Sequence, residues 1–369
     1  MDLHLLKQQN VLLFTRSMGL GGTENVVLML CEILKEKVNK IIVCSNGGIN
    51  EKRLQEMGIT HYTIPDIESK NPVVIFKTAR ILKRIIKNEK ISIIHAHHRM
   101  AAFYISFFRL FCGRVFFATS HNTFYNKKLL TRFSYKKCTL IACGQKVKDN
   151  LVDFFGIREE RIHVIHNAVK PFLEKQELDP LVDHFRKQGF FIVGNIGRLS
   201  KQKGMEYFIE SMPKILSEKP KTAFFIVGSG EDENKLKSLV DSLELNKNCI
   251  FTGYRSDCQN IASQFDLLVL SSLWEGLPLT PIEAFSVKKT IVATRVDGTP
   301  EVVHHLNNGI LVQPCNPSEI AESIIMLENN PSLLKKLEFS AYETYNNEFS
   351  FSVFSRRIIA FYKERFSDE

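Results

Sequence analysis

Short apolar runs alternate with amphipathic stretches along most of the chain. In the first half, apolar runs at residues 10–15, 40–44 and 115–120 are separated by segments whose apolar positions recur at helical spacing, such as residues 73–87. Short β-rich runs joined by helices are typical of right-handed βαβ units, and such units build a parallel sheet. The first half is therefore predicted to be an α/β domain.

The alternation lapses between residues 170 and 188, where Pro180 falls, and we expect a linker there. A second alternating series begins at residues 190–196. A chain of 369 residues is too long for one ordinary domain and suits two, each able to bury its own core. The sequence therefore predicts an α/β protein with one domain over residues 1–171 and another over residues 172–349.

The composition is that of a soluble globular protein, with 44% hydrophobic and 24% charged residues. Residues 1–7 contain no basic stretch followed by an apolar one, so we expect no signal peptide. Residues 100–118 resemble a membrane span, but Arg109 and Arg114 interrupt them and favour two core elements instead. The eight cysteines are scattered without a C-x-x-C pair, which favours a reducing cytoplasm.

Positive charge is concentrated in the first half. Residues 1–180 hold 28 Lys and Arg against 16 Asp and Glu, a net charge of +12, whereas the remainder carries −3. The densest stretches are residues 77–90 and 124–137. A solvated helix face, an anionic membrane surface and nucleic acid all stay open as explanations. Nucleic acid is the least favoured, because no nucleic-acid-binding module is visible.

The stretch from Ser271 to Glu301 follows a short apolar run that is predicted to be a buried strand. It leads into a helix for which Thr280 is the expected N-cap, with Pro281 at the first helical position. Free backbone amides at the positive end of a helix, beyond the carboxyl end of a strand, bind anions. The amides expected to do so are those of Gly276, Leu277, Leu279 and Thr280.

Two carboxylates, those of Glu275 and Glu283, belong to this loop and helix. Pointed at a phosphate they would repel it, so a binding role requires them to accept hydrogen bonds from hydroxyl groups. Sugar nucleotides carry both phosphates and hydroxyls. The alternative is that Glu283 is only a capping-box partner of Thr280, and Glu275 a solvated loop residue.

Basic residues follow the first apolar run of the second half, in GRLSKQKG. Arg198 and Lys203 lie there beside the expected start of a helix near Gly204, where fixed positive charge would stabilise a leaving diphosphate. As isolated residues they would be interpreted as surface charges. Gly228 and Gly230 end a later strand, where either close approach to a ligand or helix capping explains them.

Two motifs in the first half also suggest binding. Gly21 and Gly22 lie in GLGGTEN, a near miss to the dinucleotide fingerprint because Glu24 replaces its third glycine; a plain turn into a helix is the alternative. His95 and His97 share one face of a strand, which raises the question of a metal site. No cysteine or carboxylate with ligand spacing is nearby, so packing and hydrogen bonding are favoured.

His121 stands at the end of the apolar run 115–120, at the edge where α/β sheets bind ligands, although a lone histidine is usually structural. No D-x-D motif is present, and the acidic residues 231–233 are expected to start a helix, where negative charge is favoured. We therefore expect no catalytic metal and no cofactor.

Glu275 and Glu283 in WEGLPLTPIEA form an E-x7-E signature, and with the surrounding chain the sequence resembles the retaining glycosyltransferases of family 4. The resemblance covers nearly the whole chain and is strongest over residues 194–303. It implies the GT-B architecture, in which two Rossmann-like domains face each other across a cleft. It also implies that a last helix, here residues 350–366, packs back on the first domain.

The resemblance assigns roles to these residues. Arg198 and Lys203 would hold the donor diphosphate. Glu283 would accept from the ribose hydroxyls and Glu275 from hydroxyls of the transferred sugar, which His121 would contact from the other side. The remaining donor-binding positions are Gly21 and Gly22 near the diphosphate, Gly228, Arg255 beside the base, and the loop amides named above.

The sequence is thus expected to encode a retaining glycosyltransferase. It would move a hexose or N-acetylhexosamine from a UDP- or GDP-sugar to a lipid-linked or lipopolysaccharide-type saccharide in surface polysaccharide synthesis. It would work without a protein general base, in the cytoplasm, peripherally on the inner face of the membrane. A sugar-nucleotide 2-epimerase, a hydrolase and a non-catalytic nucleotide-binding partner on the same scaffold remain as alternatives.

Overall fold

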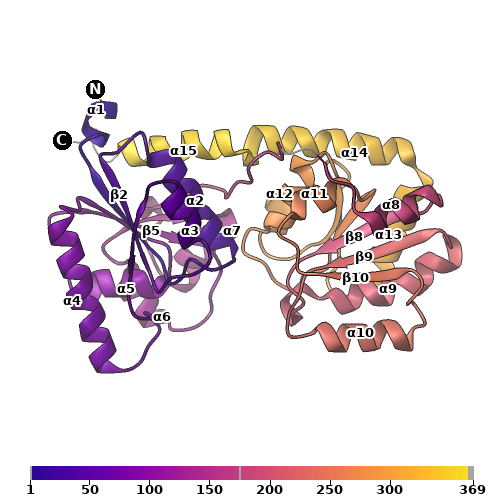
Figure 1. The fold of residues 1–369 in the computed structure, drawn as a ribbon, viewed down its shortest axis with the longest axis horizontal. Coiled ribbons are helices and arrows are strands. Elements are labelled where there is room, and N and C mark those ends of the chain that lie inside the picture. Colours follow the sequence, from indigo (N-terminus) through magenta and orange to yellow (C-terminus); the bar gives the residue numbers. More distant parts are fainter. Residues whose placement is uncertain (1, 174–175, 365–369) are drawn as a thin grey trace. The chain divides into compact units, whose positions relative to one another are not determined.

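The computed structural model describes residues 2–173 and 176–364, which form two compact units (Figure 1). The first unit contains the chain up to Asn167 together with the segment from Phe354 onward, and the second runs from Ala168 to Val353. Each unit is built on a parallel sheet flanked by helices, so the predicted α/β class is confirmed.

Within the described residues, the first unit holds a seven-stranded sheet in the order β3-β2-β1-β4-β5-β6-β7, with every neighbouring pair parallel. Most of its strands are apolar runs buried on both faces, as parallel sheets require. The strands are β1 (Asn10–Phe14), β2 (Lys40–Ser45), β3 (Thr60–Thr63), β4 (Ile93–Ala96), β5 (Val115–Ser120), β6 (Thr139–Ala142) and β7 (Ile162–Val164).

The helices of the first unit follow the predicted alternation. They are α1 (Asp2–Leu6), α2 (Gly22–Leu34), α3 (Glu51–Glu56), α4 (Pro72–Asn88), α5 (Arg99–Phe107), α6 (Lys128–Tyr135), α7 (Gln145–Asp149) and the short turns η1 (Asn150–Phe154) and η2 (Glu159–Arg161). The stretch 100–118 divides into α5 and β5, as predicted. In the described part of the chain, no helix combines the length and the apolar character needed to cross a membrane.

The last helix, α15 (Phe351–Glu364), joins the first unit from Phe354 onward. Its Tyr362 hydroxyl lies 2.7 Å from Nδ1 of His95 on β4, and its Phe361 ring lies 4.7 Å from that of Phe117 on β5. Residues 365 and 366 of the expected helix lie outside the described residues.

The second unit contains, among the described residues, a six-stranded parallel sheet in the order β10-β9-β8-β11-β12-β13. The strands are β8 (Phe191–Ile196), β9 (Thr222–Val227), β10 (Cys249–Gly253), β11 (Leu267–Leu270), β12 (Ile291–Thr294) and β13 (Ile310–Val312). The chain moves from β8 outward to β9 and later returns to β8 with β11. Because ligands bind where strand order reverses, the loops after β8 and β11 are the place to look for a site.

Helices lie on both sides of this second sheet, with α9 and α10 on one side and α11 and α12 on the other (Figure 1). They are α8 (Pro180–Lys187), α9 (Met205–Glu218), α10 (Glu233–Ser242), α11 (Cys258–Ser263), α12 (Leu279–Ser286), α13 (Pro317–Asn329) and α14 (Pro331–Thr344), with the short turns η3 (Lys201–Lys203), η4 (Thr299–Glu301) and η5 (Tyr345–Phe349).

One helix lies where a linker was expected. In α8, Pro180 occupies the first helical position, and the Asp179 carboxylate accepts from the amides of Leu181 and Val182 at 2.9 and 3.2 Å. The expectation of an irregular linker over residues 170–188 is therefore wrong for residues 180–187, which form α8. A proline that interrupts a pattern also serves as the first residue of a helix, since its missing N–H has no intrahelical partner there.

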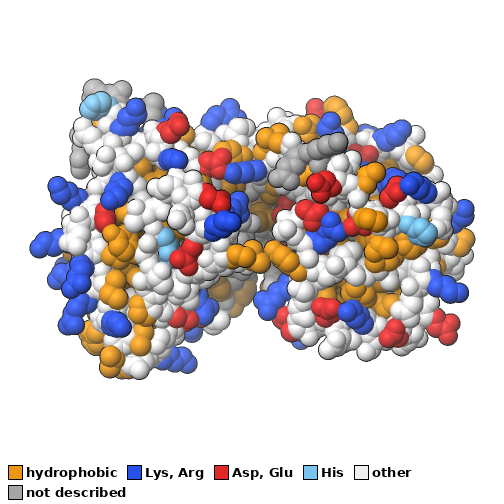
Figure 2. Space-filling view, viewed as in Figure 1, with side chains coloured by type: hydrophobic (Ala, Val, Ile, Leu, Met, Phe, Trp, Pro, Cys, Tyr) orange, Lys and Arg blue, Asp and Glu red, His pale blue; other side chains and the backbone are white. Residues whose placement is uncertain are grey.

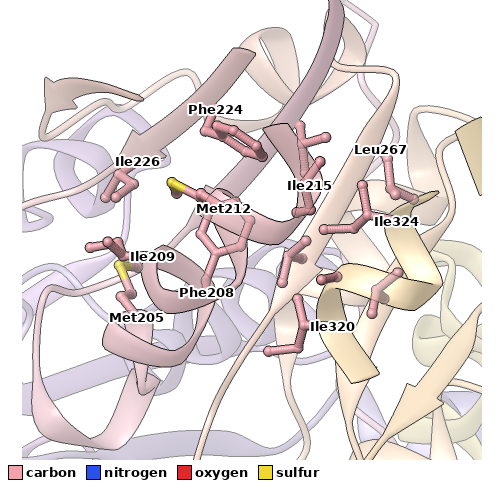
Figure 3. Packing of buried hydrophobic residues seen from close by; sticks show 14 of the residues in the cluster. Met205, Phe208, Ile209, Met212, Ile215, Phe224, Ile226, Leu267, Ile320 and Ile324 are labelled. Carbon is pink, nitrogen blue, oxygen red and sulfur yellow. The ribbon is translucent and has the colours of Figure 1, made fainter. Parts of the chain in front are cut away.

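The core of the second unit is formed by α9 and α13 packed against the sheet (Figure 3). Phe208 and Met212 of α9 lie beside Phe224 of β9, and Ile320 and Ile324 of α13 complete the cluster. All five side chains are fully buried. This packed layer holds β8 and β9 in place, so the loops that leave their carboxyl ends start from a rigid base.

Candidate active site

A largely buried ion pair in the second unit joins the loops after β8 and β11. Lys203 Nζ lies 2.6 Å from Glu275 Oε1, with both side chains largely buried. The Ser272 hydroxyl donates to the same carboxylate oxygen at 2.7 Å. Gly204 makes this approach feasible, because it adopts a φ of 53° and a Cβ there would lie 2.4 Å from the carbonyl oxygen of Ser271.

The backbone of Glu275 is held by a third loop, between β12 and η4. The amide of Glu275 donates to Oδ2 of Asp297 at 2.8 Å. Asp297 has a φ of 39°, a left-handed conformation that is uncommon for a residue with a side chain. A Cβ on the next residue, Gly298, would lie 2.0 Å from the carbonyl oxygen of Gly276. The two loops are therefore in direct backbone contact.

Arg198 is held by a different carboxylate. Its Nη2 and Nε lie 3.0 and 3.1 Å from Oε2 of Glu231, which precedes α10. Both side chains are mostly exposed to solvent. Exposed ion pairs contribute little to stability, so this pair can exchange its partner for another anion at small cost.

Glu283 lies on α12, partly buried. Burial raises the pKa of its carboxyl, and the positive charge of Lys203 opposes that shift. Within the described ranges its carboxylate accepts no hydrogen bond from the protein. Such a carboxylate is open to donors from a ligand.

The capping-box expectation for Glu283 is wrong. Helix α12 begins at Leu279 with Pro278 as its N-cap, and no side chain caps it. Thr280 is already inside the first turn, and its hydroxyl lies 3.5 Å from the carbonyl oxygen of Ile196 on β8. Pro278 starts the helix earlier than the sequence suggested, because its φ of −70° already suits a helix entry.

The amides expected to bind an anion are free of protein acceptors. In the part of the chain that the structure describes, the amides of Gly276 and Leu277 and the first-turn amides of Leu279 and Thr280 donate to no carbonyl or side chain. Unpaired amides at a helix start carry partial positive charge. These amides are therefore available to an anion, and their binding of one stays a prediction.

Gly228 and Gly230 are explained by backbone packing. A Cβ on Gly228, whose φ is 141°, would lie 1.9 Å from the carbonyl oxygen of Gly197. A Cβ on Gly230 would lie 2.2 Å from the carbonyl oxygen of Leu199. Both glycines therefore let the loop after β9 pack against the loop that carries Arg198. A direct contact of Gly228 with donor stays a prediction.

Arg255 is fully engaged within the protein. Its Nε and Nη2 lie 2.9 and 2.6 Å from the two carboxylate oxygens of Asp257, and its Nη1 lies 2.5 Å from Asp179. These contacts tie the loop after β10 to the N-cap of α8. A role for Arg255 beside the nucleotide base stays a prediction.

Three histidines stack in the first unit at the ends of β4 and β5. The ring centroids of His95 and His97 are 4.2 Å apart, and those of His97 and His121 are 5.7 Å apart. His95 bonds Thr119 and Tyr362, which confirms its packing role. No group of three metal-ligand side chains occurs among the described residues.

His121 and His97 differ from His95 because their buried ring nitrogens have no hydrogen-bond partner in the described structure. Burial lowers the pKa of His121 to about 4, with the nearby charge of His98 adding to the effect. Both rings are therefore neutral near pH 7 and able to bond a ligand hydroxyl.

Gly21 and Gly22 open α2, with Gly21 as N-cap. A Cβ on Gly21 would lie 2.5 Å from Oε2 of Glu24, whose other carboxylate oxygen accepts from the Ser17 hydroxyl at 2.6 Å. The carboxylate of Glu24 would have to move to admit a side chain at Gly21. Its expected contact with donor and acceptor stays a prediction.

Three residues that hold the predicted ones were not expected to take part in the site: Ser272, Glu231 and Asp297. The Asp297–Gly298 dipeptide is a turn signal that could have been noticed in the sequence. Nothing in the sequence shows that this turn bonds the Glu275 amide, because that contact depends on the parallel pairing of β11 and β12.

Two family models together match most of the chain. Residues 20–171 match the model described as glycosyltransferase family 4, and residues 182–344 match that described as glycosyl transferases group 1. The Escherichia coli protein named UDP-Gal:alpha-D-GlcNAc-diphosphoundecaprenol alpha-1,3-galactosyltransferase is 28% identical over 323 residues, which cover 80% of this chain and 81% of that protein.

Solved structures agree in fold. A glycosyltransferase from Rickettsia africae superposes with a TM-score of 0.83 at 23% identity, covering 98% of this chain and 100% of that one. Anabaena Alr3699/HepE in complex with UDP-glucose also gives a TM-score of 0.83, at 19% identity and with 97% and 100% coverage. At these identities the likeness establishes the fold.

Proposed function

Because the chain is a glycosyltransferase of family 4 with the two-domain GT-B fold, we propose that it transfers a hexose or N-acetylhexosamine from a UDP- or GDP-sugar with retention of anomeric configuration. The observation that carries the proposal is the group formed by Lys203, Glu275 and the free amides after Glu275. It combines fixed positive charge with a carboxylate, the pair of chemistries that a sugar diphosphate needs.

In this proposal the second unit binds the donor. The ammonium of Lys203 has three N–H donors, so it can keep Glu275 and still donate to a phosphate. Arg198 exchanges Glu231 for the diphosphate, and the amides of Gly276 and Leu277 donate to phosphate oxygens. Further amides at the start of α12, those of Leu279 and Thr280, add the positive end of that helix.

The carboxylates recognise hydroxyls. Glu283, with no protein donor among the described residues, accepts from the ribose hydroxyls. Glu275 uses its free carboxylate oxygen for a hydroxyl of the transferred sugar, while its other oxygen stays on Lys203 and Ser272. From the first unit, His121 donates or accepts at that sugar as a neutral imidazole, in line with the family resemblance.

The proposed chemistry is front-face substitution. The bond between the anomeric carbon and the diphosphate oxygen breaks while the acceptor oxygen attacks the same face, and the acceptor proton passes to the leaving phosphate. Charge that develops on the diphosphate is stabilised by Arg198 and Lys203. These two cations supply the compensation that a divalent metal gives elsewhere, and we propose that catalysis needs no metal, no cofactor and no protein general base.

For the acceptor we propose a lipid-linked or lipopolysaccharide-type saccharide used in surface polysaccharide synthesis. The E. coli relative is named for transfer to GlcNAc-diphosphoundecaprenol. The net charge of +12 over residues 1–180 would favour peripheral contact with an anionic membrane. We therefore propose that the protein works in the cytoplasm, on the inner face of the membrane.

A donor panel tests the proposal. The protein is incubated with UDP- and GDP-sugars and membrane lipid extract, and products are read by mass spectrometry. We expect one donor to give a glycosylated lipid. Without acceptor, we expect the same donor to be hydrolysed slowly. Lys203→Met should abolish transfer, because the leaving diphosphate loses its cation. Hydrolysis of simple glycosides that persists in Lys203→Met would indicate a glycosidase, and silence with every donor would indicate a binding protein.

A further inference from the structure

A pocket of about 450 Å³ opens on the first unit between α6 and the segment 156–161. None of the residues assigned above to donor binding lines it. Its wall combines apolar side chains, from Leu129, Phe133 and Ile157, with a larger basic group. The basic lining residues are Arg132, Lys136, Arg158 and Arg161.

Most of this positive charge is not neutralised. Across the described ranges, the side chains of Arg132 and Lys136 have neither an ion-pair partner nor a hydrogen-bond acceptor. Arg158 pairs with Glu160 at 3.2 Å, and both are mostly exposed. The Arg161 guanidinium donates to two backbone carbonyls just after α6. These bonds fix its position but do not neutralise its positive charge. The lining of the pocket therefore carries net positive charge, half of it on side chains without a partner among the described residues.

An apolar strip extends from the pocket wall. It is made of the exposed Phe107, Leu129 and Phe133 together with the partly exposed Phe103. The ring of Phe133 lies 6.2 Å from that of Phe103 and 6.5 Å from that of Phe107. Leu129 is 82% exposed, Phe107 52% and Phe133 45%. Contiguous aromatic and aliphatic surface next to cations is typical of side chains that enter the boundary between lipid headgroups and acyl chains.

The basic side chains of α4 belong to the same unit and lie outside the pocket. Its exposed Lys77, Arg80, Lys83, Arg84 and Lys87 face solvent, and the view in Figure 2 shows Lys and Arg gathered along the edge of the unit where α4 runs. These residues would attract an anionic surface without forming a cavity. They provide the comparison needed to separate diffuse attraction from a built site.

We propose that the pocket binds the phosphate headgroup of one anionic phospholipid, with the acyl chains against Leu129 and Phe133. Guanidinium groups match phosphate oxygens in geometry, which suits Arg132 and Arg161. A soluble phosphate would leave the apolar strip in water, whereas a lipid covers it. The inference rests on the membrane contact proposed above and deepens it from general attraction to a defined lipid site.

The test is flotation of the full-length protein with vesicles of phosphatidylcholine, with and without phosphatidylglycerol. Arg132→Glu/Lys136→Glu should weaken binding to the anionic vesicles about tenfold or more. The matched control, Lys83→Glu/Arg84→Glu on α4, makes the same charge change outside the pocket and should weaken binding by a clearly smaller factor. Leu129→Ser/Phe133→Ser keeps the charge and should also weaken binding, since a lipid needs the strip.

Each outcome of the flotation experiment either supports the lipid site or overturns it. Equal losses in the pocket and α4 variants would show diffuse attraction and overturn the lipid site. Unchanged binding of Leu129→Ser/Phe133→Ser would show that the apolar strip makes no contact with lipid, and it would overturn the lipid site. If the unmodified protein does not bind anionic vesicles, both the proposed membrane contact and the lipid site are contradicted. Circular dichroism verifies that each variant is folded. Titration of the same preparations with UDP and GDP tests donor binding separately. A failure of the lipid site can therefore be distinguished from a failure of the proposed donor binding.

Discussion

Lys203 Nζ lies 2.6 Å from Glu275 Oε1, so the cation proposed to hold the diphosphate and the carboxylate proposed to hold the sugar orient each other. The same carboxylate oxygen accepts from Ser272, and the Glu275 amide donates to Asp297. Two further residues, Ser272 and Asp297, thus hold the Glu275 side of the ion pair in place. Preorganisation of this kind places charge where it develops during reaction, without reorganisation at that moment.

Removal of Lys203 alone should destabilise the fold. In Lys203→Met the Glu275 carboxylate is left buried and unpaired, and we expect a loss of about 3 kcal/mol in the free energy of unfolding. The double variant Lys203→Met/Glu275→Gln should recover most of that loss, because the uncompensated charge is gone. Neither variant should transfer sugar. Urea unfolding followed by circular dichroism measures the first effect; recovery of transfer in the double variant would contradict the role of Lys203.

Glu231 is expected to compete with the donor for Arg198. In Glu231→Gln the guanidinium no longer has to leave a carboxylate, so KM for the donor should fall by about twofold to fivefold with kcat unchanged. Glu322→Gln, which removes the exposed partner of Lys214 at 2.6 Å on another helix, is the matched control and should leave KM unaltered. A raised KM in Glu231→Gln would mean that Glu231 instead positions Arg198 for binding.

Gly298 should tolerate no side chain. A methyl group at this position would lie 2.0 Å from the Gly276 carbonyl oxygen, so Gly298→Ala must push apart the loops that hold Glu275. We expect a loss of about 1–3 kcal/mol in stability together with weaker donor binding. Gly19→Ala, whose Cβ would come no closer than 3.8 Å to any atom, is the control for thermal unfolding. Equal melting temperatures for both variants would show that the loops are not in contact.

Donor affinity should depend on pH through Glu283. Burial raises the pKa of this carboxyl, and only its ionised form accepts from two ribose hydroxyls. Affinity should therefore fall as pH falls, beginning at a higher pH than an ordinary glutamate would give. Glu283→Gln should bind about tenfold more weakly at neutral pH and show a flatter pH dependence.

The same shift predicts an effect on stability. Because the folded-state pKa of Glu283 lies above its unfolded value, its contribution is present at low pH and is lost as pH rises through the raised pKa. At neutral pH, the free energy of unfolding of Glu283→Gln should therefore be larger than that of the unmodified protein. Denaturant titrations at acidic and neutral pH measure the difference, and a loss of stability at neutral pH would indicate a protein partner for the carboxylate.

The strands of both sheets were predictable, because parallel strands are near-continuous apolar runs and their turns break the pattern. The residues at which helices begin were harder to predict. Pro180 was interpreted as a break but begins α8, and Thr280 was interpreted as the N-cap of α12 but lies inside that helix. Proline sets φ without stating on which side of it the helix lies. Such boundaries depend on what the neighbouring loops pack against.

Spacing and the family resemblance predicted which residues belong to the candidate site, which stays a prediction, whereas the side chains that contact them were not predicted. Lys203 and Glu275 are far apart in sequence, and their contact depends on the pairing of β8 with β11 and on the left-handed turn at Gly204. The bond from the Glu275 amide to Asp297 likewise requires the neighbouring strand β12. Sequence periodicity identifies strands but does not give their order in the sheet.

Calorimetric titration of UDP and GDP tests the central claim most directly. The unmodified protein is compared with Arg198→Gln/Lys203→Met, whose folding is verified by circular dichroism. We predict that the nucleotide bound by the unmodified protein binds the double variant about a hundredfold more weakly, because two charge-assisted contacts to the diphosphate are removed. Unchanged affinity in a folded double variant would contradict the assignment of these cations to the diphosphate, and with it the proposed site.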